Sequence, residues 1–334
     1  MAETLLAVDV GGTKTELALF DLQGKGREPL QRAVSPCAGH EGVEEIIRAF
    51  LDDTRFRPDF ACLGVAGIIR DGAARLTNLP WLIEEETLAR EFSLAGVRII
   101  NDMTALCAAL SNLEGADLLT LQAGRMEKGG TRAVIAPGTG LGEGSLIADG
   151  STFQPRGSEG GHADFAPADD EQIALLQWLR TKTRPVSCEM LCSGLGIPAL
   201  YDFCRQSSPI PETAAIREEL RKAADRTPII LAGAIAASPC PLCSRTMELF
   251  LSILGSEAGN LALKLYATGG LYIGGGIPPR LSGHIPFTGF LEAFRRKANM
   301  EELLANIPVH LIVKRDAVLL GAAAYGSQIF RPLC

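Results

Sequence analysis

The chain has 334 residues, of which 47% are hydrophobic and 21% charged, so it is a globular protein long enough for two domains. A net charge of -7 without a basic run argues against nucleic acid or an anionic membrane surface as a partner. The longest apolar run, 229–237, is too short to span a bilayer, and Asp9 interrupts the first apolar run, which is untypical of a secretory signal. We therefore expect a cytoplasmic protein.

The N-terminal part alternates between strand-like and helix-like segments. LLAVDV (5–10) and ELALF (16–20) favour two strands, and EGVEEIIRAFLDDT (41–54) has the spacing of an amphipathic helix. ACLGVAGII (61–69) and VRIIND (97–102) are typical of buried strands. This order predicts an α/β domain.

The first two strands enclose the glycines Gly11 and Gly12. The stretch lacks the GxxxxGK[ST] pattern of a P-loop, and the residues after the glycines alternate like a strand, whereas a dinucleotide fingerprint opens a helix. A glycine hairpin lets backbone N–H groups approach a phosphate, and Asp9 suits such a site if Mg²⁺ lies between them. The alternative is an ordinary tight hairpin with no ligand.

A second glycine loop, APGTGLGEG (136–144), comes after a strand-like run in the middle of the chain. Its alternate glycines predict a poor strand and a poor helix, and therefore a bulged turn or an exposed backbone surface that could bind phosphate with the first hairpin. A third glycine turn occurs in LYIGGGIPPRL (271–281). A glycine hairpin in each half suggests an internal duplication.

The region after residue 204 is the least regular. RQSSPIPE (205–212) predicts a loop, TAAIREELRKAAD (213–225) a helix, and SPCPLC (238–243) a turn, which together form an excursion on the larger domain. Nine cysteines without a disulfide framework indicate reduced, mostly buried thiols. A zinc site on the four thiols of Cys188, Cys192, Cys240 and Cys243 is the alternative to two buried pairs.

An ordered set of motifs resembles the bacterial glucokinase family, ATP-dependent hexose kinases of the actin-like superfold. The motifs are DVGGTKTELALFD, NDMTALCAAL, PGTGLG, SEGGHADFAP, CEMLCSGLGIPALYDF, SILGSEAGNLAL, YIGGGIPPRL and IPVHLIVKRDAVLLGAAAYG. They extend from end to end, and the segment after GGH lacks the cysteines of the zinc-containing sugar-kinase and repressor relatives. Lys14 replaces an asparagine common in the family, which changes the charge near the phosphates.

Phosphoryl transfer to a sugar hydroxyl requires a carboxylate to accept the proton. The resemblance makes Asp102 this base, although Asn101 and Asp102 also fit the start of a helix. The spacing of Glu159 and His162 would put both on one face of a helical turn. The resemblance implies that the glucose site is lined by Asn101, Asp102, Glu159, His162 and Glu189. It also implies that Asn78 and Trp81 lie near the sugar, with a place in the core as the alternative for Trp81.

The resemblance also implies a nucleotide site made largely of backbone. Its predicted residues are Asp9, Val10, Gly11, Gly12, Thr13, Gly138, Thr139, Gly140, Gly274, Gly275 and Gly276, with Asp9 acting on Mg²⁺ indirectly. The expected fold is a two-domain actin-like ATPase (ribonuclease H-like) sugar kinase with an interdomain cleft. We expect a small domain of 1–104 plus 316–334 and a large domain of 105–315.

The expected function is ATP-dependent phosphorylation of glucose at its 6-hydroxyl, with Mg²⁺ and a homodimer implied by the resemblance. Two alternatives are a kinase for another hexose or an N-acetylhexosamine, and a non-catalytic sugar-sensing regulator. The absence of a DNA-binding module before the first strand and the presence of Asp102 disfavour the regulator.

Overall fold

The computed structural model describes residues 3–22, 27–76, 79–150 and 152–330. The chain divides into two compact units. The first comprises Met1–Asp117, Gly144–Gly157 and Lys314–Cys334, and the second comprises Leu118–Glu143 and Ser158–Val313. Among the described residues, none of the helices combines the length and the apolar character that crossing a bilayer requires.

The first unit is built on a five-stranded sheet with the order β3-β2-β1-β4-β8. Its strands are β1 (Thr4–Val10), β2 (Lys14–Asp21), β3 (Gln31–Pro36), β4 (Phe60–Val65) and β8 (Gly96–Asn101). The first three strands are antiparallel, whereas β1, β4 and β8 are parallel. The predicted hairpin of 5–10 and 16–20 is therefore confirmed.

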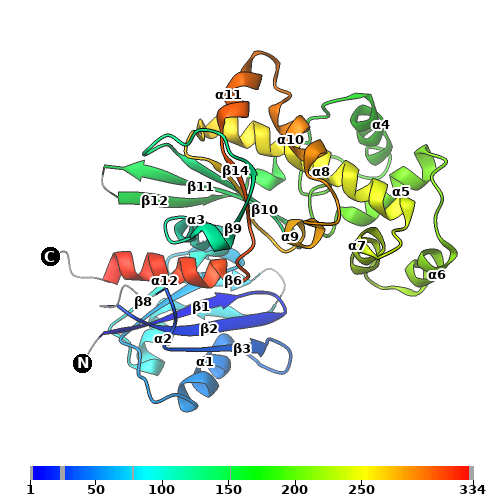
Figure 1. Ribbon diagram of the computed structural model, residues 1–334. Coiled ribbons are helices and arrows are strands. Elements are labelled where there is room, and N and C mark those ends of the chain that lie inside the picture. Colours follow the sequence, from blue (N-terminus) through cyan, green and yellow to red (C-terminus); the bar gives the residue numbers. More distant parts are fainter. Residues whose placement is uncertain (1–2, 23–26, 77–78, 151, 331–334) are drawn as a thin grey trace. The chain divides into compact units, whose positions relative to one another are not determined.

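Helices cover both faces of this sheet (Figure 1). They are α1 (Val43–Asp52), α2 (Glu85–Phe92), α3 (Asp102–Ala109) and α12 (Ala317–Phe330), with a short 3₁₀ turn at Gly115–Asp117. Strand residues of one parity, such as Leu6 and Val8, share a core with Ile46 of α1. Residues of the other parity, such as Leu5 and Ala7, pack with α12. This alternation is the signature of a strand buried on both faces.

The prediction of one buried strand at 61–69 was wrong. Strand β4 ends at Val65, and β5 (Gly67–Arg70) leaves the sheet to pair with β6 (Ala73–Leu76) and β7 (Leu82–Glu84) in a separate three-stranded sheet. A Cβ at Gly67 would collide with the backbone oxygen of Arg75, so glycine allows this close pairing. An apolar run shows burial but not the sheet to which each half belongs.

The second unit contains most of a six-stranded sheet with the order β12-β11-β10-β13-β14-β9. Its strands are β9 (Leu118–Gln122), β10 (Arg132–Pro137), β11 (Leu141–Asp149), β12 (Thr152–Ser158), β13 (Leu271–Ile273) and β14 (Val309–Ile312). Strand β11 starts at Leu141 and includes Gly142 and Gly144. The expectation that the alternate glycines disfavour a strand was therefore wrong for 141–144. A Cβ on Gly144 would lie 2.6 Å from Cys107 Sγ and 2.8 Å from Arg156 O, which explains why glycine is tolerated.

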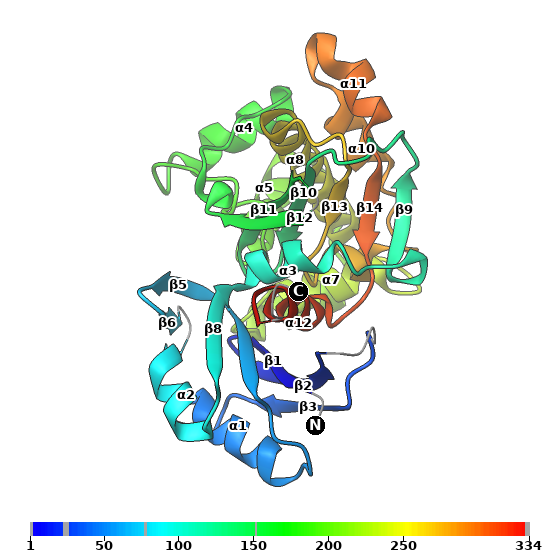
Figure 2. The same cartoon turned by 90° about the vertical axis from the view of Figure 1, so that its left-hand side faces the viewer.

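The long helix α8 (Pro241–Leu265) forms the centre of the second unit and packs against β10 (Figure 2). The other helices are α4 (Asp170–Leu179), α5 (Ile197–Ser207), α6 (Ala214–Lys222), α7 (Thr227–Ile235), α9 (Pro278–Leu281), α10 (Thr288–Arg295) and α11 (Glu301–Asn306), with 3₁₀ turns at Gly160–His162 and Ala298–Met300. The helix predicted at 213–225 corresponds to α6. The turn expected at 238–243 extends no further than Cys240, the N-cap, and 241–243 are instead the first residues of α8, because proline fits the first turn of a helix.

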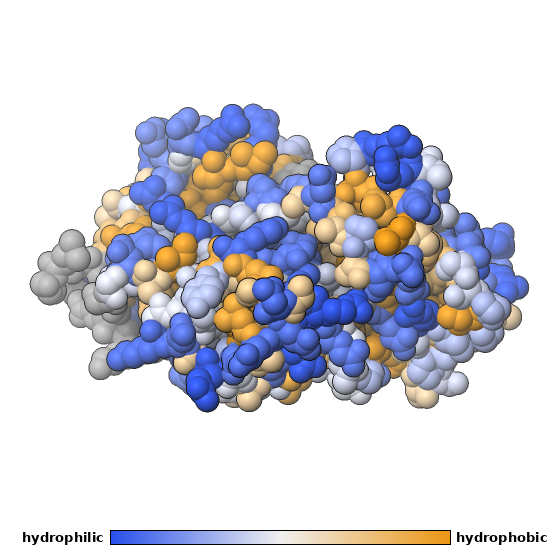
Figure 3. Space-filling view, turned by 90° about the horizontal axis from the view of Figure 1, so that it is seen from above, coloured by the Kyte–Doolittle hydropathy of each residue, from blue (hydrophilic) through white to orange (hydrophobic). Residues whose placement is uncertain are grey.

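The surface seen in Figure 3 is largely hydrophilic, with apolar side chains in separate patches.

The strand orders of the two larger sheets correspond, β3-β2-β1-β4-β8 against β12-β11-β10-β13-β14, which agrees with the predicted internal duplication. In each sheet the central strand, β1 or β10, is followed directly by a glycine turn, which begins at Gly11 or Gly138.

Candidate active site

Asp9 lies near the carboxyl end of β1, on the face of the sheet that carries α3 and α12. It has the parity of Leu5 and Ala7, which pack against α12. Its register partner on β2 is Glu16, and its partner on β4 is Gly64. Because β1, β4 and β8 are parallel, their carboxyl ends meet at one edge, where Asn101 ends β8.

The electrostatic environment of Asp9 is unfavourable to its charge. Burial above all, and then the nearby carboxylates of Asp102 and Glu16, raise the pKa of Asp9 to about 7, against a smaller opposing effect of Lys14. Glu16 is only 4% exposed and receives the Lys14 ammonium at 2.5 Å and the Arg32 guanidinium at 2.6 Å. Sequence reasoning missed Glu16, although its parity relative to the hairpin glycines put it opposite Asp9.

Asn101 and Asp102 stand where β8 gives way to α3. Asn101 is the N-cap, and its side chain accepts a hydrogen bond of 2.9 Å from Met103 N, while Asp102 Oδ1 accepts from the same N–H at 2.8 Å. The helix-start interpretation of this pair is therefore confirmed, with Asn101 as the cap. Asp102 is then the first helical residue and is partly exposed, so the capping residue and the predicted base are adjacent in the chain.

Glycines fix the position of α3 and therefore of Asp102. A Cβ on Gly321 of α12 would collide with Ala105 O of α3, and a Cβ on Gly64 would lie 3.2 Å from both Ala105 Cβ and Val318 Cγ1. Larger residues at either position would push α3 away from the sheet. The helix that begins at Asp102 is thus packed closely against both α12 and β4.

The hairpin between β1 and β2 is tight and open to solvent. Gly11 N donates to Lys14 O at 3.1 Å, Gly11 and Gly12 are partly exposed, and Thr13 is exposed. Val10, in contrast, is fully buried in the core on the α1 face. Its side chain is therefore structural, and only its backbone could face a ligand.

Two further glycine loops lie side by side in the second unit. Strands β10 and β13 are parallel with Ile135 opposite Ile273, so the loops after them, 138–140 and Gly274 to Gly276, leave the same sheet edge. Gly274 N donates to Ile135 O at 2.8 Å. Gly275 has φ of +80°, and a Cβ there would collide with Pro137 O. This turn needs glycine for its own geometry.

The three polar residues predicted to bind the sugar in the second unit come together. Glu159 precedes the 3₁₀ turn that ends at His162, and its Oε2 lies 3.8 Å from His162 Nε2. Glu189 Oε1 lies 3.8 Å from His162 Nδ1. The Glu159 and His162 side chains are 80% and 63% exposed, so they are available to a ligand, whereas Glu189 is half-buried. Such a group offers both donors and acceptors to sugar hydroxyls.

The structure does not place the other residues singled out from the sequence, namely Asn78, Trp81 and the cysteines, in this candidate site. Asn78 lies outside the described residues. Trp81 is 4% exposed and belongs to the core of the first unit. The cysteines within the described ranges are free and buried, and no group of three or more histidine, cysteine or acidic residues there is placed to hold a metal.

The predicted chemistry requires a divalent cation, and the carboxylate of Asp9 is a donor of the kind that such an ion takes. Mg²⁺ takes one or two protein carboxylates and completes its shell with water and phosphate oxygens. Burial first, and then the nearby carboxylates of Asp102 and Glu16, raise the pKa of Asp9, so its negative charge is poorly compensated. A divalent cation would relieve that repulsion.

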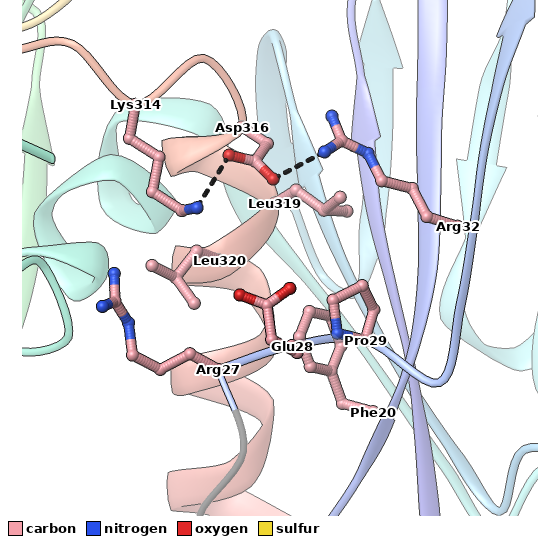
Figure 4. Close-up of a pocket in the computed structure, with 9 residues that line it drawn as sticks. All are labelled: Phe20, Arg27, Glu28, Pro29, Arg32, Lys314, Asp316, Leu319 and Leu320. Carbon is pink, nitrogen blue, oxygen red and sulfur yellow. Dashed lines mark hydrogen bonds and ion pairs between the residues drawn. The ribbon is translucent and has the colours of Figure 1, made fainter. Parts of the chain in front are cut away.

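A cavity of about 130 Å³ lies elsewhere in the first unit, at the start of α12 (Figure 4). Asp316 there binds both Arg32, at 2.7 Å, and Lys314, at 3.2 Å. Arg27 pairs with Glu114 and Asp117. Each of these cations is therefore neutralised by a carboxylate, and the lining contains none of the residues predicted for sugar or nucleotide.

Comparison with known proteins supports the same chemistry. The family model described as glucokinase matches residues 6–329. A curated glucokinase from a Nostoc species is 37% identical, and the alignment covers 97% of this chain and 99% of the relative.

Solved structures show the same fold. A glucokinase from an Antarctic psychrotroph superimposes with a TM-score of 0.82 at 30% identity, covering 98% of this chain and all of that chain. A glucokinase from Balamuthia mandrillaris, solved in complex with glucose, gives a TM-score of 0.77 at 21% identity over 98% of this chain and 94% of that chain. The predicted two-domain actin-like sugar-kinase fold is thereby confirmed.

Proposed function

Because the chain belongs to the glucokinase family, we propose that it transfers the γ-phosphoryl group of ATP to the 6-hydroxyl of glucose, giving ADP and glucose 6-phosphate. The observation that carries the proposal is the carboxylate of Asp102 at the first position of α3, near the partly buried Asp9. A family member that had become a non-catalytic sugar sensor would not need this carboxylate.

Asp102 acts as the general base in this proposal. As the sugar oxygen attacks the γ-phosphorus, the bond between that phosphorus and the bridging oxygen of ADP breaks, and the hydroxyl proton passes to the Asp102 carboxylate. Asn101, anchored as the helix cap, fixes the backbone from which Asp102 projects. The precise placement of one carboxylate is the main contribution of α3.

Glucose recognition falls to Asn101, Asp102, Glu159, His162 and Glu189, with Asn78 proposed on the family resemblance alone. Carboxylates and an imidazole suit hydroxyl groups, because each hydroxyl donates one hydrogen bond and accepts others. We place glucose ahead of other hexoses and N-acetylhexosamines because the chain belongs to the glucokinase family.

ATP is bound mainly by backbone in this proposal. The loops Gly11 to Thr13 and Gly138 to Gly140 bind the phosphates through backbone N–H groups other than those of Gly11 and Gly138, which donate within their own turns. Gly274 to Gly276 allow the adenosine to approach the main chain. Asp9 acts on the phosphates through Mg²⁺, which would neutralise charge on the phosphate oxygens when bound. The remaining proposals are the domain bounds 1–104 plus 316–334 and 105–315, a homodimer, and a cytoplasmic location.

A coupled kinase assay over a panel of sugars and phosphoryl donors tests the proposal. The expected result is turnover with glucose and ATP that requires Mg²⁺ and exceeds turnover with mannose, fructose and N-acetylglucosamine. Absence of turnover with every sugar, in a preparation that binds glucose, would identify a sensor. Preference for a different sugar or for polyphosphate would replace the substrate assignment.

A further inference from the structure

Glu189 touches more than the group predicted to bind sugar. Its Oε1 lies 3.8 Å from His162 Nδ1, while its Oε2 accepts a hydrogen bond of 2.9 Å from Leu141 N. Leu141 comes immediately after the glycine loop at 138–140, which is predicted to bind phosphate. One carboxylate therefore joins the sugar group and the phosphate loop within the second unit.

Main-chain bonds strengthen the same connection. Gly194 N donates to Gly138 O at 2.8 Å, and Leu195 N donates to Thr139 O at 3.3 Å. On its other side, Glu189 N donates to Gly161 O at 2.8 Å, in the turn that carries His162. The segment 189–195 thus holds both the turn and the loop.

Gly140 provides the space that this arrangement needs. A Cβ at position 140 would collide with Glu189 Oε2, the oxygen that accepts from Leu141 N. The colliding atom is the end of a flexible side chain, so an added methyl group would displace the carboxylate and leave the loop backbone in place. For Gly138, two residues earlier in the same loop, no atom of the described residues lies within 4 Å of such a Cβ.

We propose that Glu189 couples glucose binding to nucleotide binding, because the phosphate loop holds the carboxylate in the position that binds the sugar. The inference rests on the proposed function and adds a positioning role to Glu189. A shift of the loop must move the carboxylate, and a shift of the carboxylate must release Leu141 N. Coupling of this kind is reciprocal, so each ligand changes the affinity for the other by the same factor.

The decisive comparison is between Gly140→Ala and Gly138→Ala. Glucose binding is measured by calorimetry without nucleotide, on variants whose thermal unfolding matches that of the parent. Displacement of the Glu189 carboxylate should weaken glucose binding by about 10-fold or more in Gly140→Ala, the loss expected when a charged hydrogen-bond partner is removed. Gly138→Ala should keep its glucose dissociation constant within about 2-fold of the parent, whatever it does to nucleotide.

A double-mutant cycle separates the coupling from general damage. In a Glu189→Ala background the methyl group at 140 has no carboxylate to displace, so Gly140→Ala should cause no further loss of glucose affinity. Binding of MgADP without glucose should weaken in Glu189→Ala and stay near the parent value in Glu189→Gln, whose amide oxygen still accepts from Leu141 N.

Each failure has a distinct meaning. If the parent protein does not bind or phosphorylate glucose, the proposed function is wrong and this inference falls with it. If the parent is an active glucokinase but Gly140→Ala and Gly138→Ala bind glucose equally, the proposed function stands and the coupling through Glu189 is wrong. Additive losses in the cycle would likewise contradict the coupling.

Discussion

The two large sheets share a strand order but differ at the carboxyl ends of their central strands. In the first unit β1 ends beside carboxylates, and burial with Asp102 and Glu16 raises the pKa of Asp9 to about 7. In the second unit β10 ends in a glycine loop whose carbonyls accept hydrogen bonds from Gly194 and Leu195. The same framework thus supports concentrated charge in one unit and a shaped backbone in the other.

This difference suggests a division of labour. Crowded carboxylates are costly to the folded state but suit proton transfer and a divalent cation. A backbone loop held by hydrogen bonds and a cluster of Glu159, His162 and Glu189 suits recognition. The proposal is therefore that the first unit supplies the reacting groups, and the second supplies most of the binding.

The largest effect is expected from Asp102→Asn. Asparagine cannot take the proton, so turnover should fall by roughly 10²- to 10⁴-fold, the range for a positioned general base. Folding stability should change by less than about 1 kcal/mol, because Asn101 remains the helix cap. Initial rates and thermal unfolding on one preparation check both values, and turnover within a few-fold of the parent would exclude Asp102 as the base.

Gly275→Ala should damage the backbone of the second unit. A Cβ there collides with Pro137 O at a φ of +80°, so we expect destabilisation of about 1 to 3 kcal/mol. Gly276→Ala is the matched control, because no atom in the described part of the chain lies within 4 Å of its Cβ. It should unfold like the parent and raise the KM for ATP. Equal unfolding temperatures for both variants would refute this explanation of the turn.

Asp9→Asn should stabilise the protein measured without nucleotide. The folded pKa of Asp9, about 7, exceeds the ordinary 3.8, so this group lowers stability as the pH rises from about 4 to 7, and the full cost is present above pH 7. Asparagine removes this cost, giving a gain of about 2 to 4 kcal/mol at pH 8 that vanishes near pH 4. Denaturant unfolding across this range measures the gain. A variant less stable than the parent at pH 8 would contradict the unfavourable burial and repulsion of the Asp9 charge.

A smaller change with the same sign is expected from Glu143→Gln in the second unit. Burial and then the Glu257 carboxylate raise the pKa of Glu143 to about 7, with an opposing effect of Lys264, and Glu143 Oε1 has no hydrogen-bond partner among the described residues. The glutamine variant should gain about 1 to 3 kcal/mol above pH 7 and nothing near pH 4.5. A pH-independent difference in unfolding would show that charge is not the cause.

Local patterns were sufficient to predict the hairpin at Gly11, the helix start at Asn101 and the turn that carries Glu159 and His162. Each of these depends on neighbours within a few residues. The ordered motifs identified the fold, because their sequence from end to end is far more specific than any one of them.

Features that depend on distant partners could not be predicted in the same way. The bond from Leu141 N to Glu189 spans 48 residues, and no local pattern encodes it. Strand β4 ends at Val65 because β5 pairs in the separate three-stranded sheet, and the apolar run 61–69 does not reveal that pairing. Glu16 is an intermediate case, since strand parity places it opposite Asp9 but not next to Arg32.

The most direct test of the division of labour is the calorimetric glucose isotherm of Asp102→Asn. If the first unit supplies the reacting group and the second supplies most of the binding, the variant should bind glucose within about 3-fold of the parent affinity while its turnover falls by roughly 10²-fold or more. A fall in glucose affinity as large as the fall in turnover would contradict this division, because Asp102 would then act chiefly in binding.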